Sequence, residues 1–170
     1  MTDWLVVLVP LFKSVHITAL CVWCGGLIAM PLMLAKHDPA VPQEDYDRIR
    51  KATHLTYTLG LTPSAVIAVI AGTWLIFMRD TFAPWFYAKL FFVMLLLAAH
   101  VWIGHVLVLV AEASHKVQPP KPYLPISAVL VSVIGILALV LGKPELDWIQ
   151  FPSWFLEPMD GRLPFEVPRL

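Results

Sequence analysis

Charged residues are scarce in this chain, at 14% of 170 residues, while 59% of the residues are hydrophobic. Basic and acidic residues balance, so the net charge is zero and gives no reason to expect a nucleic-acid partner. Cysteine is also rare, with two residues, and the sequence has no internal repeat. This low charge content, together with a mean hydropathy of +0.75, excludes an ordinary soluble domain and indicates an integral membrane protein.

Four long apolar segments make up most of the sequence. A helix needs roughly 20 apolar residues to cross a hydrocarbon layer of about 30 Å, and four segments are long enough. They are residues 8–34, 55–78, 84–111 and 123–141. The first is too long for the core of a signal peptide, so we expect it to be retained as a span. The sequence therefore predicts an all-α protein, with a four-helix bundle in the lipid bilayer over residues 1–146 and an extramembrane tail over residues 147–170.

Basic residues outside the apolar segments are divided unevenly between the two sides of the membrane. The first and third connections carry six, namely Lys36, Arg48, Arg50, Lys51, Lys116 and Lys121. The opposite side carries Arg79, Lys143, Arg162 and Arg169, of which the last two lie far out in the tail. Because basic loops tend to stay in the cytoplasm, we expect the first and third connections there and both termini outside. The charged run over residues 44–51 predicts a short interfacial helix before the second span.

The two cysteines, Cys21 and Cys24, have the CxxC spacing of many redox and metal sites. They lie in the middle of the first apolar segment, where two cysteines one turn apart serve packing in most membrane helices. A copper or disulfide role is the alternative. Gly25-Gly26 and Gly104 also lie inside spans, and such glycines permit close approach of neighbouring helices.

Ionisable residues interrupt two of the spans: Lys13 and His16 in the first, and Lys89 and His100 in the third. A charge near the bilayer centre costs at least about 2.5–3.5 kcal/mol, so such residues normally face the bundle interior and mark a site. Lys89 and His100 are eleven positions apart and fall within about 20° of one helix face. We expect the two lysines at similar depth, where they need an anion such as an acidic side chain or a porphyrin propionate.

The intramembrane histidines suit haem, because helical bundles bind haem through imidazoles on facing helices. His16 and His100 are the main candidates for iron ligands, and His54 and His105 are further candidates. Counted from the span edges, however, His100 lies about 10 Å deeper than His16. His16 can instead hold one haem with a different or absent second ligand, while His100 or His105 pairs with His54. The structural alternative for each is a hydrogen bond to a carbonyl across the bundle.

The tail over residues 147–170 interleaves aromatic residues with prolines. It is too short and too often interrupted by proline to cross the membrane. An aromatic strip of this kind can lie on the membrane surface or dock on a neighbouring subunit. The alternative is a poorly ordered terminus.

Several motifs together resemble the HemJ-type protoporphyrinogen oxidases, which are related to CopD-like membrane proteins. In the first span the matching sequence is KSVH at residues 13–16, followed by Trp23, Gly26, Met30-Pro31 and Lys36-His37. Further matches are LTP at 61–63, GTWLI at 72–76, Trp85 with AKL at 88–90, His100 with Gly104, and VLGKPEL at 140–146. The resemblance covers about residues 10–146. Departures are Leu32, where the family has arginine, the segment over residues 116–125, and the tail.

This resemblance implies a bacterial inner-membrane protein that binds haem b and oxidises protoporphyrinogen IX, with electrons passing to the respiratory chain. It makes His16 the leading haem ligand and Lys89 the leading functional basic residue, and His100 falls on a family histidine. Lys13 and Lys89 would then hold the propionates of the porphyrin substrate. The competing function is a non-enzymatic haem- or copper-binding accessory subunit of a respiratory or photosynthetic complex. In that case the tail would dock on the other membrane subunits.

Overall fold

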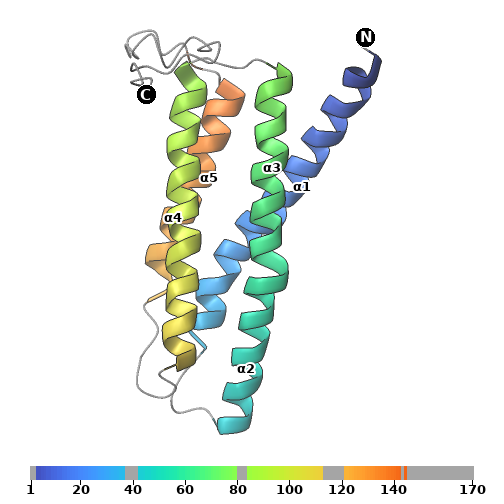
Figure 1. Ribbon diagram of the computed structural model, residues 1–170. Coiled ribbons are helices and arrows are strands. Elements are labelled where there is room, and N and C mark those ends of the chain that lie inside the picture. The colour runs from blue at the N-terminus through green and yellow to red at the C-terminus, as the bar shows by residue number, and fades with distance from the viewer. Residues whose placement is uncertain (1–2, 37–41, 80–83, 113–120, 143, 145–170) are drawn as a thin grey trace, which may run out of the picture.

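The computed structural model describes residues 3–36, 42–79, 84–112, 121–142 and 144, and every regular element in this part of the chain is a helix (Figure 1). Four helical stretches are long and apolar enough to cross a membrane. Helices suit this environment because all their backbone hydrogen bonds are made within the segment. The structure thus confirms the predicted all-α bundle with four membrane-spanning helices. The interpretation of the tail concerns residues outside the described part of the chain.

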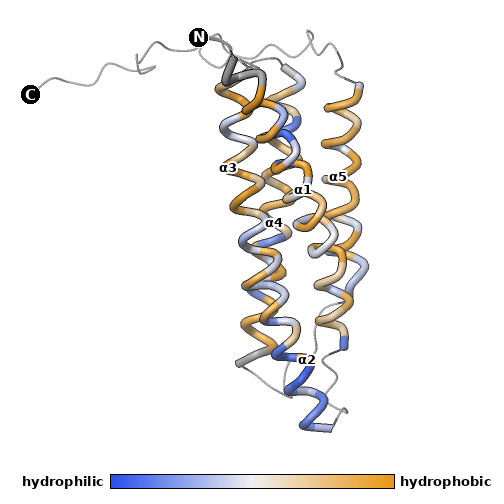
Figure 2. The backbone as a smooth tube through the Cα atoms, turned by 90° about the vertical axis from the view of Figure 1, so that its right-hand side faces the viewer, coloured by the Kyte–Doolittle hydropathy of each residue, from blue (hydrophilic) through white to orange (hydrophobic). Residues whose placement is uncertain are grey.

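The first, third and fourth spans are single helices, and the second is built from three consecutive elements. The single helices are α1 (Asp3–Leu34), α4 (Pro84–Glu112) and α5 (Tyr123–Gly142). The second span consists of α2 (Gln43–Leu55), the π-helical turn η1 (Thr56–Leu61) and α3 (Thr62–Arg79). The charged run over residues 44–51 therefore forms a helix that continues directly into the span. Figure 2 shows the change from hydrophilic α2 to apolar α3.

Helix α1 is central to the packing. It crosses α3 over a long contact, while α4 packs along α5, and α1 also contacts α4 and α5 and so joins the two pairs. The start of α1 and the end of α5 lie at the same end of the bundle, and α2 lies at the other (Figure 1). The buried cluster includes Trp23, Leu27, Leu96, Ile103 and Val129. Buried side chains from several helices thus form one continuous core.

The outward faces of the spans are as apolar as their inward faces. Large side chains such as Phe77, Met94 and Leu141 are 69–80% exposed. Helices that are hydrophobic all round are typical of membrane spans, because their outward side chains are solvated by lipid tails. Polar side chains inside the bundle are therefore the exceptions that need an explanation.

Candidate functional site

His16 on α1 turns its imidazole toward the backbone of α3. Its Nδ1 atom lies 2.7 Å from the carbonyl oxygen of Ala68. Because a carbonyl oxygen only accepts hydrogen bonds, Nδ1 carries the proton and donates it, and the lone pair of the neutral ring is left on Nε2. Histidines that bind metals commonly donate their other ring N–H to a backbone carbonyl in this way. His16 is thus held in the tautomer that an Nε2 ligand requires.

Gly72 provides the space for this ring on the surface of α3. A Cβ atom at position 72 would lie 2.8 Å from His16 Cε1 and 3.2 Å from His16 Nδ1, closer than the imidazole could tolerate without moving. Gly72 is one helical turn beyond Ala68, so the missing side chain leaves the Ala68 carbonyl open to α1. The small residue at this position therefore sets how His16 lies against α3.

The two candidate lysines differ in their surroundings. Lys89 on α4 is half-buried. Lys13 precedes His16 by one turn of α1 and has an exposed side chain. Neither lysine forms an ion pair with a residue in the described ranges. Lys89 thus lies partly inside the bundle, whereas Lys13 lies on its outside.

His100 on α4 is buried, at 7% exposed, and its ring is bound to α1. The indole Nε1–H of Trp23 donates a hydrogen bond of 3.2 Å to His100 Nδ1. An indole nitrogen can only donate, so Nδ1 accepts and the neutral ring carries its proton on Nε2. This tautomer is the reverse of that of His16. Neither ring nitrogen of His100 offers a free lone pair in this arrangement, so binding iron there would require the bond from Trp23 to break.

Tyr57 from η1 covers the other side of His100. The two rings are stacked, with centroids 5.0 Å apart and planes inclined by 22°. The Tyr57 hydroxyl donates to the His100 carbonyl oxygen at 3.3 Å and lies directly over Gly104, where a Cβ atom would overlap it. Gly104, which was expected to let two helices approach closely, thus makes room for the Tyr57 side chain instead. The hydroxyl of Thr62 donates to the Tyr57 carbonyl oxygen, five residues earlier, within the wider π-helical turn.

His16 and His100 do not converge on one point. His100 lies beside Trp23, which follows His16 by seven residues on α1, or about 10 Å along the helix axis. The depth difference expected from the sequence is therefore present in the structure. A single cofactor held by both rings would have to span this offset. Of the two rings, His16 is the one whose hydrogen bond leaves a ring nitrogen lone pair free.

The remaining candidate ligands are dispersed. His54 lies on α2 and His105 on α4, and both side chains are exposed. Cys21 is exposed and Cys24 is half-buried, and both are free thiols. No group of three His, Cys, Asp or Glu side chains within the described ranges is arranged to hold a metal ion. Within the described part of the chain, the imidazoles thus lie apart on α1, α2 and α4.

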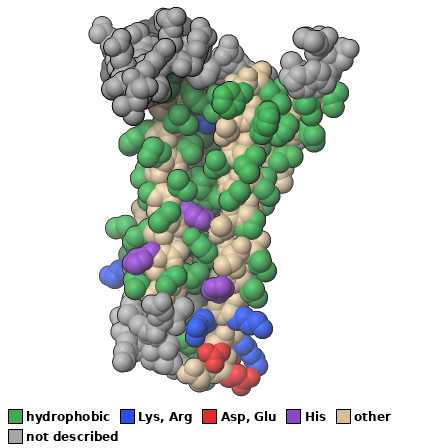
Figure 3. Space-filling view, viewed as in Figure 1, with side chains coloured by type: hydrophobic (Ala, Val, Ile, Leu, Met, Phe, Trp, Pro, Cys, Tyr) green, Lys and Arg blue, Asp and Glu red, His purple; other side chains and the backbone are tan. Residues whose placement is uncertain are grey.

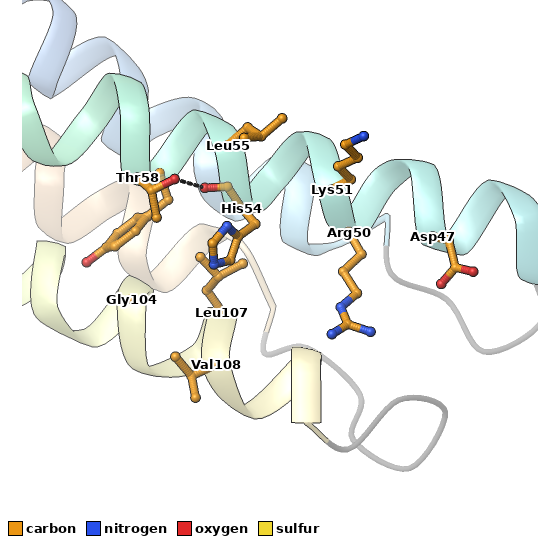
Figure 4. Close-up of a pocket in the computed structure, with 10 residues that line it drawn as sticks. Asp47, Arg50, Lys51, His54, Leu55, Thr58, Gly104, Leu107 and Val108 are labelled. Atoms are coloured by element: carbon orange, nitrogen blue, oxygen red, sulfur yellow. Dashed lines mark hydrogen bonds between the residues drawn. The ribbon is translucent and has the colours of Figure 1, made fainter.

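A pocket lies between α2 and α4 at the end of the bundle opposite the start of α1 (Figure 4). Its volume is about 660 Å³. The residues that line it are Asp47, Arg50, Lys51, His54, Leu55, Tyr57, Thr58, Gly104, Leu107 and Val108. Figure 3 shows charged side chains gathered at this end of the molecule. We call this cavity the α2–α4 pocket.

Sequence reasoning missed two side-chain relationships at this site. Nothing in the sequence singles out Tyr57, because its contact with His100 joins residues 43 positions apart. Gly72 belongs to the GTWLI motif, but its role depends on the imidazole of His16 on another helix. Gly104 was the available signal, since a glycine at a packed position indicates that something approaches closely.

The fold and these contacts define a class: a bundle with four membrane-spanning helices that carries a ligand-competent histidine on α1 and a half-buried lysine on α4. The chain is similar to a protein from Synechocystis sp. named protoporphyrinogen IX oxidase, with 28% identity over 149 residues. The match covers 80% of this chain and 70% of that protein. No family model and no solved structure matches the chain. The likeness supports the resemblance to HemJ-type membrane proteins that the motifs indicate.

Proposed function

We propose that this protein is a haem b-binding membrane oxidoreductase that oxidises protoporphyrinogen IX. The observation that carries the proposal is the hydrogen bond from His16 Nδ1 to Ala68, because it leaves Nε2 of a half-buried intramembrane imidazole available as a ligand. The printed name of the Synechocystis protein supports the choice of substrate. Lys89, which is half-buried and has no ion pair among the described residues, supports an anion-binding role.

The residues present fit haem with one protein ligand from this bundle. His16 would hold the iron through Nε2, and the hydrogen bond to Ala68 would fix the ring and raise its basicity as a ligand. When bound, the haem would supply one-electron redox chemistry. His100 is committed to Trp23 and would act as a core residue that joins α1 to α4.

Lys89 would bind a substrate propionate. Oxidation of protoporphyrinogen IX to protoporphyrin IX removes six electrons and six protons, while the propionates keep their charge throughout. A half-buried ammonium without an acidic partner among the described residues is suited to hold such a carboxylate. Lys13, which is exposed on α1 one turn before His16, would attract the second propionate. The electrons would pass to the respiratory chain.

The proposed location is the bacterial inner membrane, with both termini on the outer side. The structure supports one part of this topology, since α1 starts and α5 ends at the same end of the bundle (Figure 1). The direction rests on the basic residues, which are concentrated in the first and third connections. In this orientation His16 would lie toward the outer leaflet and the α2–α4 pocket toward the cytoplasm.

The decisive experiment combines a spectrum with genetic complementation. Purified His16→Ala should lose the Soret band of b-type haem, whereas the matched control His105→Ala, which removes an exposed histidine from α4, should keep it. Wild type should restore growth of a strain that lacks protoporphyrinogen oxidase, and His16→Ala should not. A full Soret band in His16→Ala would overturn the haem assignment. Failure of haem-loaded wild type to complement would favour the accessory-subunit function.

A further inference from the structure

We infer that the α2–α4 pocket is a binding site for an amphipathic anion, with a carboxylate or phosphate head and an apolar body. The pocket is separate from the His16 site, and the proposed function makes no use of it. At about 660 Å³ it falls within the range of cavities that hold small organic ligands, roughly 300–1,000 Å³. Its two walls differ in chemistry, and that difference indicates the type of ligand.

The polar wall comes from α2 and carries unpaired positive charge. Arg50 and His54 are four residues apart on one face of α2, and Figure 4 shows both side chains extending toward α4. Arg48, which does not line the pocket, is paired with Glu44 and Asp45. By contrast, neither Arg50 nor Lys51 has an acidic partner within the described part of the chain.

The lining also contains one carboxylate, Asp47, and this acid receives a hydrogen bond of 3.4 Å from Gln43 Nε2. The lining also contains two permanent cations, Arg50 and Lys51, so its net charge is positive. In Figure 4 Lys51 extends to the other side of α2. Arg50 is thus the group best placed to bind the anion, because a guanidinium offers paired donors that match a carboxylate or a phosphate.

The apolar wall comes from α4 and from the end of α2. Leu107 extends from α4 toward α2 in Figure 4, and Val108 and Leu55 also line the pocket. Gly104 and Tyr57 also line the pocket. Gly104 has no side chain to fill it, and the Tyr57 ring offers an aromatic surface. An aromatic or branched apolar body would bury this surface, while its charged head would meet Arg50 at the polar wall.

The pocket lies where the second span changes character. Hydrophilic α2 supplies the cations, and η1 supplies Tyr57 and Thr58. A π-helical turn inside an otherwise α-helical segment is rare and frequently occurs at functional sites. Here the turn sets Tyr57 against His100, so a ligand in the pocket would contact the same tyrosine that covers the buried histidine. Two sources of ligand have the required chemistry: a tetrapyrrole with propionate groups and an acidic membrane phospholipid.

The test uses the full-length protein purified in an uncharged detergent. Binding of protoporphyrin IX, a dicarboxylate, is compared with binding of its dimethyl ester by fluorescence titration. Retention of phosphatidylglycerol is compared with that of phosphatidylcholine by native mass spectrometry. We expect one anionic probe to bind about ten-fold more tightly than its matched uncharged or zwitterionic counterpart. A preference for the diacid identifies a tetrapyrrole source, and a preference for phosphatidylglycerol identifies a lipid source.

The variants locate the binding. Arg50→Gln should lower the affinity for the preferred anion about ten-fold, since a charge-assisted hydrogen bond is lost. Arg48→Gln removes the same charge from the same helix outside the pocket and should leave the affinity within about two-fold. No preference for either anion, or equal effects of the two variants, would overturn the proposal. The variant His16→Ala distinguishes binding in the α2–α4 pocket from binding at the His16 site. If porphyrin binding is lost in His16→Ala but kept in Arg50→Gln, the pocket assignment is refuted and the haem proposal stands.

Discussion

Trp23 donates its indole N–H to Nδ1 of His100 at 3.2 Å, and this bond joins α1 to α4 in the core of the bundle. Both side chains are buried, with Trp23 at 1% and His100 at 7% exposed. The bond fixes the tautomer of His100, and Tyr57 stacks on the opposite face of the ring. A histidine that the sequence offers as an iron ligand is thus engaged as a structural hydrogen-bond acceptor.

Trp23→Phe should lower the free energy of unfolding by about 1 kcal/mol, because the buried Nδ1 of His100 loses its donor while most of the aromatic volume is kept. The measurement is unfolding of the detergent-solubilised protein by a denaturing detergent. Trp102→Phe is the control, since Trp102 is 37% exposed on the same helix as His100 and should change stability little. Equal losses in the two variants would show that the hydrogen bond is not what stabilises the core.

Gly72→Ala should displace His16 and destabilise the bundle by about 1–3 kcal/mol, since its Cβ would lie 2.8 Å from the imidazole. If His16 holds haem, the haem content of the purified variant should also fall. Gly25→Ala is the matched control, because nothing lies within 4 Å of its Cβ position. That change should leave the haem spectrum intact and stabilise α1 by about 0.5–1 kcal/mol, the usual advantage of alanine over glycine in a helix. A normal haem spectrum in Gly72→Ala would contradict the close packing around His16.

Lys89→Met should reduce protoporphyrinogen oxidation about 10- to 100-fold while haem content stays near normal, because a charge-assisted contact with a propionate is lost. Lys89→Arg should restore activity only in part, since a guanidinium keeps the charge but changes the geometry. Lys36→Met, at an exposed position in the turn after α1, is the control for loss of a positive charge. Release of haem or unfolding in Lys89→Met would instead identify Lys89 as a structural or haem-anchoring residue.

Alkaline phosphatase fused after Leu146 should be active in a bacterial host, because the basic first and third connections favour the cytoplasm. A fusion within residues 37–41 should be inactive. Enzyme activity normalised to the amount of fusion protein is the measurement. The reverse pattern would place both termini in the cytoplasm and turn the α2–α4 pocket to the outside.

The class of this protein could be predicted from the sequence alone. Runs of apolar residues in 8–34, 84–111 and 123–141 are a local property, since the bilayer acts as the solvent for each helix separately. The intramembrane positions of His16, Lys89 and His100 could be recognised for the same reason, because a polar residue in an apolar run stands out without knowledge of its neighbours. The depth difference between the two histidines also followed from counting residues along straight helices.

The partners of those residues were decided only by the tertiary structure. The tautomers of His16 and His100 depend on which atom of another helix faces each ring: a carbonyl of α3 in one case and an indole N–H of α1 in the other. The hydrogen-bonded residues are 52 and 77 positions apart in the chain, and the rotation and crossing of the helices determine which of them meet. The pocket between α2 and α4 has the same origin, because neither helix contains it alone. Hydropathy places a residue at a depth in the membrane, and only helix packing gives it a partner.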